Sequence, residues 1–220
     1  MPASYFDVDG TLVSSNLVHT AVWYMANDLN PLRSARNIGK LLVRAPKLIA
    51  AELRDRRTFN ELLFEAFRGT SEDRLQVLAD EAYEWCMRKN IYSGARDIIS
   101  RSKELGHEVV LVSGALDFLL ARLAEDLGAD HYVGNRLEIH DGFATGKLLR
   151  PVVAGPNKSR LIANHARDNG YDLADCFGYS DSYSDVPMLS VVGKPAVINP
   201  DPKLHQLART YQWPIIELTH

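Results

Sequence analysis

The chain has 220 residues, of which 46% are hydrophobic and 24% are charged, and its net charge is -3. This length and composition predict one large globular domain, or one domain with an insertion. The net charge gives no indication of a nucleic-acid partner, and Cys86 and Cys176 are too few for a disulfide framework and are expected to be reduced thiols.

The first expected element is a short strand beginning near residue 4, directly ahead of Asp7-Val8-Asp9-Gly10-Thr11. This early start leaves no room for a signal peptide, and no apolar run reaches the ~18 residues of a membrane span. We therefore expect a cytoplasmic protein. Residues i and i+2 of a strand project to the same side, so both acids can serve one site. Paired acids are unfavourable there unless a cation binds, which favours a metal ion and phosphoryl transfer.

The next residues, 14–90, are expected to be mostly helical. Apolar side chains recur at helical spacing from Leu17 to Met25, from Ile38 to Ile49 and from Phe59 to Phe67. Ser71 is expected to begin one more helix. We interpret residues 14–90 as a helical cap inserted into a core made of residues 1–13 and 91–220.

Beyond residue 91, expected strands alternate with expected helices. The strands fall at residues 108–112, 131–133, 176–179 and 195–198, and a hairpin over 137–149 turns at Asp141-Gly142. This alternation predicts an α/β fold, with a Rossmann-like parallel sheet between two layers of helices. The cap would lie over the carboxyl ends of the strands, where ligands bind in open α/β sheets.

Several chemically active residues fall at expected strand ends or at an expected helix start. They are Asp7 with Asp9, Ser113 with Gly114, Lys158, and Asp181 with Asp185. Each signal alone is weak, but the set is chemically complete for phosphate ester hydrolysis.

That reaction needs a divalent metal to neutralise and orient the phosphate. The carboxylates suit Mg2+, whereas the seven histidines include no pair at zinc-binding spacing. The Ser113 hydroxyl, the Gly114 N–H and the Lys158 ammonium can stabilise transition-state charge. One aspartate can act as the nucleophile, and a second carboxyl beside it can carry the proton.

These segments, with Gly134-Asn135-Arg136-Leu137 and Ala196-Val197-Ile198-Asn199-Pro200, resemble the ordered motifs of the haloacid dehalogenase superfamily. The resemblance covers nearly the whole chain and is to subfamily IB, the phosphoserine-phosphatase-like branch with a C1-type cap. It implies a Mg2+-dependent phosphatase acting on a small phosphate monoester.

The resemblance also implies a role for each matching residue. Asp7 would be the nucleophile that forms a phosphoaspartyl intermediate. Asp9 would be the general acid/base and would offer its main-chain carbonyl to Mg2+, and Asp181 would complete the metal ligands. Asp185 would orient a metal-bound water or Lys158. Ser113, Gly114 and Lys158 would hold the phosphate. The acid at Asp9 favours phosphatase over dehalogenase chemistry, because an alkoxide leaving group needs a proton.

The expected substrate-reading positions depart from phosphoserine phosphatase. In that family a glutamate nine residues after the nucleophile reads the substrate ammonium, and here that position is Asn16. A cap arginine that reads the carboxylate lies five residues after a phenylalanine, and counting from Phe59 gives Phe64. The sequence thus predicts a site without either charge, which disfavours phosphoserine and makes other small organic phosphates the default.

Residues 33–57 are unusually basic, with eight Lys or Arg against Glu52 and Asp55. The stretch is either a solvated helix pair or a weak contact for an anionic membrane or lipid phosphate. Four alternatives to a general small-molecule phosphatase thus remain open. They are phosphoserine phosphatase proper, a lysophospholipid phosphatase, a phosphotransferase to an alcohol, and an idle binding module.

Overall fold

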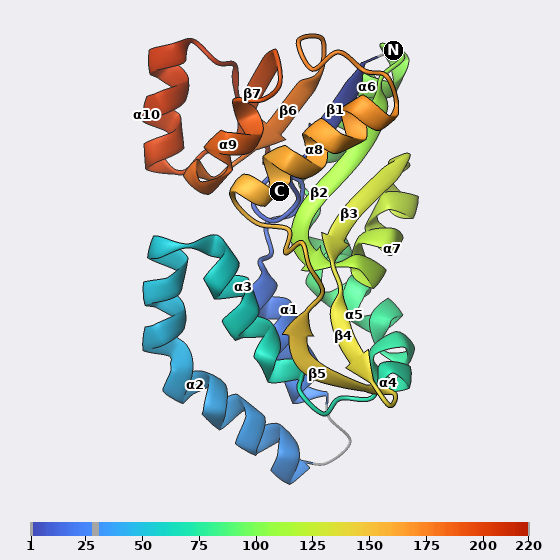
Figure 1. Ribbon diagram of the computed structural model, residues 1–220, viewed down its shortest axis with the longest axis vertical. Helices are drawn as coiled ribbons and strands as arrows, with labels where there is room; N and C mark the ends of the chain where they lie inside the picture. Colours follow the sequence, from blue (N-terminus) through green and yellow to red (C-terminus); the bar gives the residue numbers. More distant parts are fainter. Residues whose placement is uncertain (1, 28–30, 220) are drawn as a thin grey trace.

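The computed structural model describes residues 2–27 and 31–219. Figure 1 shows two parts. A sheet flanked by helices fills the upper part, and helices α1 to α5 with a small hairpin fill the lower part.

The sheet of the described residues has six parallel strands in the order β3-β2-β1-β6-β7-β8. Their bounds are β1 (Ala3–Phe6), β2 (Glu108–Leu116), β3 (His131–Asn135), β6 (Phe177–Ser180), β7 (Lys194–Ile198) and β8 (Ile215–Ile216). The predicted strands are present, and β8 is an edge strand that the sequence analysis did not identify.

Alternate residues of the central strands face opposite helix layers, because side chains alternate along a strand. On one face, Val109 and Leu111 of β2 join the core with Phe6 of β1. On the other face, Val110 of β2 packs with Tyr5 of β1. Every one of these side chains is fully buried, which explains why the strands read as continuous apolar runs.

Helices cover both faces of the sheet. The face with Phe6 packs on α6 (Ala95–Glu104) and α7 (Asp117–Leu127). The face with Tyr5 packs on α8 (Pro156–Asp168) and α9 (Val186–Leu189), and α10 (Pro202–Tyr211) packs beside β7. The expected three-layer α/β fold is confirmed.

The chain between β1 and α6 forms the helical part. Its longer helices are α1 (Leu17–Ala26), α2 (Pro31–Arg54), α3 (Arg56–Phe64), α4 (Glu72–Val77) and α5 (Ala79–Cys86). The side chains of Asn16, Asp55 and Ser71 accept hydrogen bonds from the first N–H groups of α1, α3 and α4. These residues start helices because their short oxygens satisfy otherwise unpaired donors.

The hairpin of β4 (Leu137–His140) and β5 (Phe143–Leu148) lies beside these helices (Figure 1). It turns at Asp141-Gly142, where both residues have positive φ. The Ala144 N–H donates to Thr70 O and the Gly69 N–H donates to Ala144 O, both at 2.8 Å. The expected hairpin is confirmed, and its backbone is bonded to the loop that follows α3.

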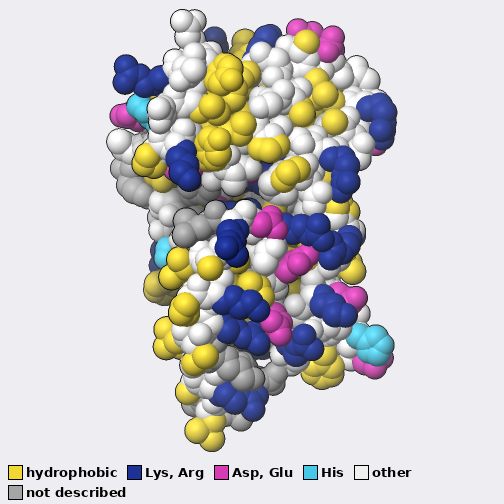
Figure 2. Space-filling model, turned by 60° about the vertical axis from the view of Figure 1, so that its left-hand side comes forward, with side chains coloured by type: hydrophobic (Ala, Val, Ile, Leu, Met, Phe, Trp, Pro, Cys, Tyr) yellow, Lys and Arg dark blue, Asp and Glu magenta, His cyan; other side chains and the backbone are white. Residues whose placement is uncertain are grey.

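Helix α2 carries most of the basic stretch. Figure 2 shows Lys and Arg side chains gathered on the lower half of one face, with acidic side chains between them. Arg44 pairs with Glu65 at 3.2 Å, whereas the side chains of Arg33 and Lys40 lie outside the described part of the structure. No described helix is long and apolar enough to cross a membrane. The cytoplasmic location stays a prediction.

Candidate active site

The candidate residues meet at the carboxyl ends of three neighbouring strands. Asp7 follows β1, Ser113 lies in the last half of β2, and Asp181 follows β6. Lys158 reaches the same place from the first turn of α8. The Asp7 N–H donates to Tyr179 O at 2.9 Å, which continues the β1–β6 pairing up to the site.

A tight loop brings Asp7 and Asp181 together. The Thr11 hydroxyl lies 3.1 Å from Asp181 Oδ1 and 3.5 Å from Asp7 Oδ2. Gly10 has φ +84°, and a Cβ there would lie 2.1 Å from Asp181 Oδ2. Only glycine gives both this conformation and this clearance.

Lys158 bridges two carboxylates away from water. Its ammonium lies 2.6 Å from Asp7 Oδ1 and 2.7 Å from Asp185 Oδ2, and all three side chains are buried. Ser180 Oγ also donates to Asp185 Oδ2, at 2.9 Å. Burial alone would lower the pKa of Lys158, but the two carboxylates outweigh it and raise that pKa. Lys158 is therefore a fixed positive charge.

Asp9 has a different environment from Asp7. Ser113 Oγ donates to Asp9 Oδ2 at 3.0 Å and accepts a hydrogen bond from the Ala115 N–H at 3.0 Å. Burial and the charge of Asp7 raise the pKa of Asp9 to about 6, against the opposing charge of Arg56. A carboxyl in this range can both give and take a proton near neutral pH.

Asp7, Asp9, Lys158 and Asp185 line a cavity of about 10 Å³, which is about the space of one water molecule. Its walls combine carboxylates and cations with apolar atoms. The lining residues are Asp7, Asp9, Leu17, Arg56, Asn60, Gly114, Val153, Ala154, Lys158 and Asp185.

The site holds more negative than positive charge. With Asp181 it contains four carboxylates against Lys158 and Arg56, so two negative charges remain if all are ionised. Burial and the charges of Asp7 and Asp185 raise the pKa of Asp181 well above its ordinary value. A divalent cation would relieve this excess, and the all-oxygen donors around Thr11 fit Mg2+.

Sequence reasoning missed two cavity residues, Arg56 and Asn60. Arg56 pairs with Glu52. Burial alone would lower its pKa, but Glu52 and the site carboxylates raise it. Asn60 is fully buried, and its Nδ2 donates to Val153 O at 3.5 Å. Its Oδ1 has no hydrogen-bond partner among the described residues. The sequence feature that could have identified them is Asp55, which is a typical first residue of a helix. A helix starting there places positions 56 and 60 one turn apart on the same face.

The two expected substrate-reading residues do not line the cavity. The side-chain Oδ1 of Asn16 accepts hydrogen bonds from the Val18 and His19 N–H groups at 3.0 and 3.2 Å, so Asn16 starts α1 and lies outside the cavity lining. Phe64 is 1% exposed and packs on Phe67, with ring centroids 5.7 Å apart. The expectation that the site has lost its cation is corrected, because Arg56 supplies one.

The structure is a three-layer α/β fold with a cluster of carboxylates at the carboxyl ends of its parallel strands. The chain belongs to the haloacid dehalogenase-like hydrolases, because the model of that family matches residues 5–190. The phosphoserine phosphatase SerB1 of Mycobacterium tuberculosis is 34% identical over 97% of this chain and 70% of its own length. The inhibition of morphological differentiation protein of Streptomyces azureus is 31% identical over 98% of this chain and 78% of its own length.

Solved structures share the fold. A Bordetella pertussis Tohama I protein of unknown function has a TM-score of 0.82 at 24% identity, covering 98% of this chain and 97% of the other. A phosphoserine phosphatase solved as a phospho-aspartyl intermediate analogue has a TM-score of 0.72 at 19% identity, covering 98% and 92%. The expected superfamily, its phosphoserine-phosphatase-like branch and the phosphatase class are confirmed. The comparisons give no support to a lipid contact.

Proposed function

We propose that the chain hydrolyses a small phosphate monoester through a phosphoaspartyl intermediate on Asp7. The observation that carries this proposal is the contrast between two neighbouring acids. Burial raises the pKa of both acids, but the Lys158 ammonium lies 2.6 Å from Asp7 Oδ1 and opposes that rise by favouring the carboxylate. Asp9 instead receives a hydrogen bond from the neutral Ser113 hydroxyl, and burial and the charge of Asp7 raise its pKa to about 6. One carboxylate is thus suited to attack and the other to carry a proton.

In the first half-reaction an Asp7 carboxylate oxygen attacks phosphorus. A bond forms between that oxygen and phosphorus, and the bond to the ester oxygen breaks. Asp9 gives its proton to the leaving oxygen, so the product leaves as a neutral alcohol. The Lys158 ammonium, the Ser113 hydroxyl and the Gly114 N–H would bind the phosphoryl oxygens as charge shifts among them.

In the second half-reaction the ionised Asp9 takes a proton from water. The water oxygen then bonds to phosphorus, and the bond to the Asp7 oxygen breaks to release phosphate and the free carboxylate. Asp185 would keep Lys158 oriented through both steps, since it binds the same ammonium at 2.7 Å. The protein returns to its starting protonation state.

Mg2+ would be held by the carboxylates of Asp7 and Asp181 and by the main-chain carbonyl of Asp9. When bound, it neutralises charge on the phosphoryl group and orients it toward Asp7. The hydrogen bonds of Thr11 to Asp7 and Asp181 support this assignment, because they hold two ligands of one site together.

Residues 14–90 would act as the cap over this site. Leu17, Arg56 and Asn60 come from this segment and line the same cavity as Asp7. Closure of such a cap excludes bulk water and protects the acyl phosphate. The hairpin over 137–148 would move with the cap, because its backbone is bonded to the loop at residues 69–72.

The cavity favours a substrate whose alcohol carries an anionic group and a hydrogen-bond donor. Arg56 can bind a carboxylate, and Asn60 can accept a hydrogen bond through its unpaired Oδ1. Phosphoserine is therefore a first substrate to test, although Asn16 does not supply the anion that would read its ammonium. Membership of a hydrolase family disfavours the idle module, and added alcohols would reveal phosphotransfer.

The test is Mg2+-dependent phosphate release from a panel of esters. The panel holds phosphoserine, sugar phosphates, nucleotides, histidinol phosphate and lysophosphatidate, with Asp7→Asn as the blank. We expect turnover that needs Mg2+ and Asp7. With a substrate that carries radioactive phosphate, the acid-precipitated wild-type protein should retain label, and Asp7→Asn should retain none. Full activity or phosphoenzyme in Asp7→Asn contradicts the proposal, as does the absence of hydrolysis across the panel.

A further inference from the structure

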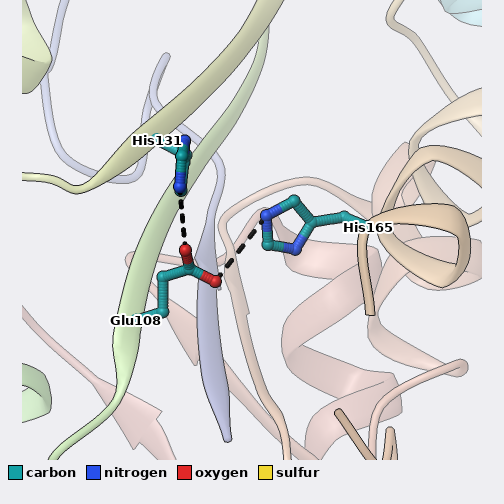
Figure 3. Close-up of side chains that lie close together, drawn as sticks. All are labelled: Glu108, His131 and His165. Carbon is teal, nitrogen blue, oxygen red and sulfur yellow. Dashed lines mark ion pairs between the residues drawn. The ribbon is translucent and has the colours of Figure 1, made fainter. Parts of the chain in front are cut away.

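A second cluster of ligand-type side chains lies at the opposite end of the sheet. Glu108 is the first residue of β2, His131 is the first residue of β3, and His165 lies in α8. Figure 3 shows both imidazole rings directed at the Glu108 carboxylate. One nitrogen or oxygen from each of the three lies within 4.8 Å of the other two.

The distances within this cluster leave one carboxylate oxygen of Glu108 without a hydrogen bond to either described histidine. His131 Nε2 lies 2.9 Å from Glu108 Oε1, whereas His165 Nε2 lies 3.7 Å from Glu108 Oε2. That second separation is too long for a hydrogen bond, and Oε2 is buried with no hydrogen-bond partner among the described residues. Two ligands of one tetrahedral zinc ion lie about 3.4 Å apart, given metal–ligand bonds of about 2.0–2.1 Å.

A further residue holds His165 in the orientation that ligation needs. The Tyr5 hydroxyl lies 3.1 Å from His165 Nδ1, and the Tyr5 ring meets the imidazole edge-on with centroids 5.7 Å apart. Tyr5 is fully buried. Metal-binding histidines characteristically use their second nitrogen for such a contact, which fixes the ring and leaves the other nitrogen for the metal.

Burial lowers the pKa of His165, against the opposing charge of Glu108, and so favours the neutral form of its imidazole. A neutral imidazole has a free lone pair for a metal. Glu108 lies mostly out of water, with 11% of its side chain exposed, while His131 is 58% exposed. The outer side of the cluster is therefore open to solvent, and a water molecule can reach a fourth ligand position from there.

We propose that Glu108, His131 and His165 bind one Zn2+ ion at the amino end of the sheet, with water as the fourth ligand. Two imidazoles and one carboxylate are a recurrent zinc ligand set. The site would join β2, β3 and α8. It would be independent of the active site, because five residues of extended strand, about 17 Å, separate Glu108 from Ser113.

The competing explanation is a simple ion pair of Glu108 with protonated histidine. Metal-free protein in saturating Mg2+, which occupies the acidic site, is titrated with Zn2+ by calorimetry and with Co2+ by visible absorption. We expect one Zn2+ per chain, a rise in melting temperature, and the strong absorption of tetrahedral Co2+. The readouts do not depend on catalytic activity.

The matched variants are His131→Gln, in the cluster, and His140→Gln, an exposed histidine that pairs with Asp141. We expect His131→Gln to lose Zn2+ binding and the Co2+ spectrum while keeping its circular dichroism spectrum and phosphatase activity. His140→Gln should behave as the wild type. Tyr5→Phe should weaken Zn2+ affinity by about 10–100-fold, the usual effect of removing such a supporting contact. Absence of Zn2+ binding, or equal binding by His131→Gln, refutes the site.

Discussion

The ammonium nitrogen of Lys158 lies 2.6 Å from Asp7 Oδ1, although 151 residues separate the two in the chain. The contact joins the first turn of α8 to the end of β1, and both residues are buried. Both groups are held there by the fold, because Asp185 binds the same ammonium from a third element. The ion pair is thus a structural link as well as a proposed part of the chemistry.

Replacing Lys158 with Met should strongly destabilise the protein. The change leaves Asp7 and Asp185 buried beside each other without a cation, and breaking a buried pair in this way lowers the free energy of unfolding by about 3–5 kcal/mol. Urea unfolding of the metal-free protein at pH 8 measures the loss. Lys147→Met removes an exposed lysine and should have little effect. Equal stabilities of the two variants would contradict the prediction.

Asp181→Asn should stabilise the metal-free protein and weaken its response to Mg2+. The amide can still accept the Thr11 hydrogen bond, and the change removes a buried carboxyl whose ionisation the charges of Asp7 and Asp185 oppose. Melting temperatures with and without Mg2+ give both effects. We expect Mg2+ to raise the melting temperature of the wild type more than that of the variant. Asp175→Asn, at an exposed position, is the control, and an equal gain in all three proteins would count against a Mg2+ ligand at Asp181.

Asp9 should make stability depend on pH. Burial and the charge of Asp7 raise its pKa from 3.8 to about 6, so the folded protein binds the proton more tightly than the unfolded chain. The stability that Asp9 contributes is complete below pH 4 and is lost as the pH rises through 6. A pKa shift of one unit corresponds to about 1.4 kcal/mol. The free energy of unfolding of Asp9→Asn, relative to that of the wild type, should therefore rise by about 3 kcal/mol between pH 4 and pH 7.

Urea unfolding in EDTA across that pH range measures this difference. A constant offset between the two proteins would show that Asp9 titrates normally. The same variant should lose turnover by about 10²–10⁴-fold, the range of general acid–base catalysis.

Arg56→Met should selectively weaken the hydrolysis of esters that carry a carboxylate. A lost charged hydrogen bond of about 1.5–3 kcal/mol lowers kcat/KM by roughly 10–100-fold. Esters without a carboxylate should change less. Arg57→Met is the matched control, because Arg57 lies one residue on, is 41% exposed and pairs with Glu61 at 3.2 Å. Equal losses for both substrate classes would assign Arg56 to the phosphate instead.

The sequence was sufficient to predict the acidic edge of the sheet. Asp7 and Asp181 each follow an apolar strand, and parallel strands end at the same edge of a sheet. The order of the motifs then places Lys158 at the start of the helix that precedes the strand leading to Asp181. These positions depend on strand ends, which short apolar runs mark clearly. The edge strand β8 was missed, because only Ile215 and Ile216 form it.

The sequence was not sufficient to predict which residues of the segment 14–90 line the cavity. Counting nine residues from Asp7 reached Asn16, but local hydrogen bonds to the start of α1 take its side-chain oxygen. Counting from Phe59 reached Phe64, the last residue of α3, whereas Arg56 and Asn60 of the same helix line the cavity. A residue count across a helical segment cannot give the direction in which a helix approaches a site. The cluster of Glu108, His131 and His165 was not predicted for a related reason, because the pairing of β2 with β3 brings its members together.

The backbone hydrogen bonds between Ala144 and the loop at residues 69–72 limit how the helical part can open. Two chain crossings, near residues 14 and 91, already connect this part to the sheet, and the hairpin adds a third connection that begins at β3. Three connections restrict the movement of the helical part against the sheet more than two connections would. Any opening of the proposed cap would then have to bend the chain at all three connections together.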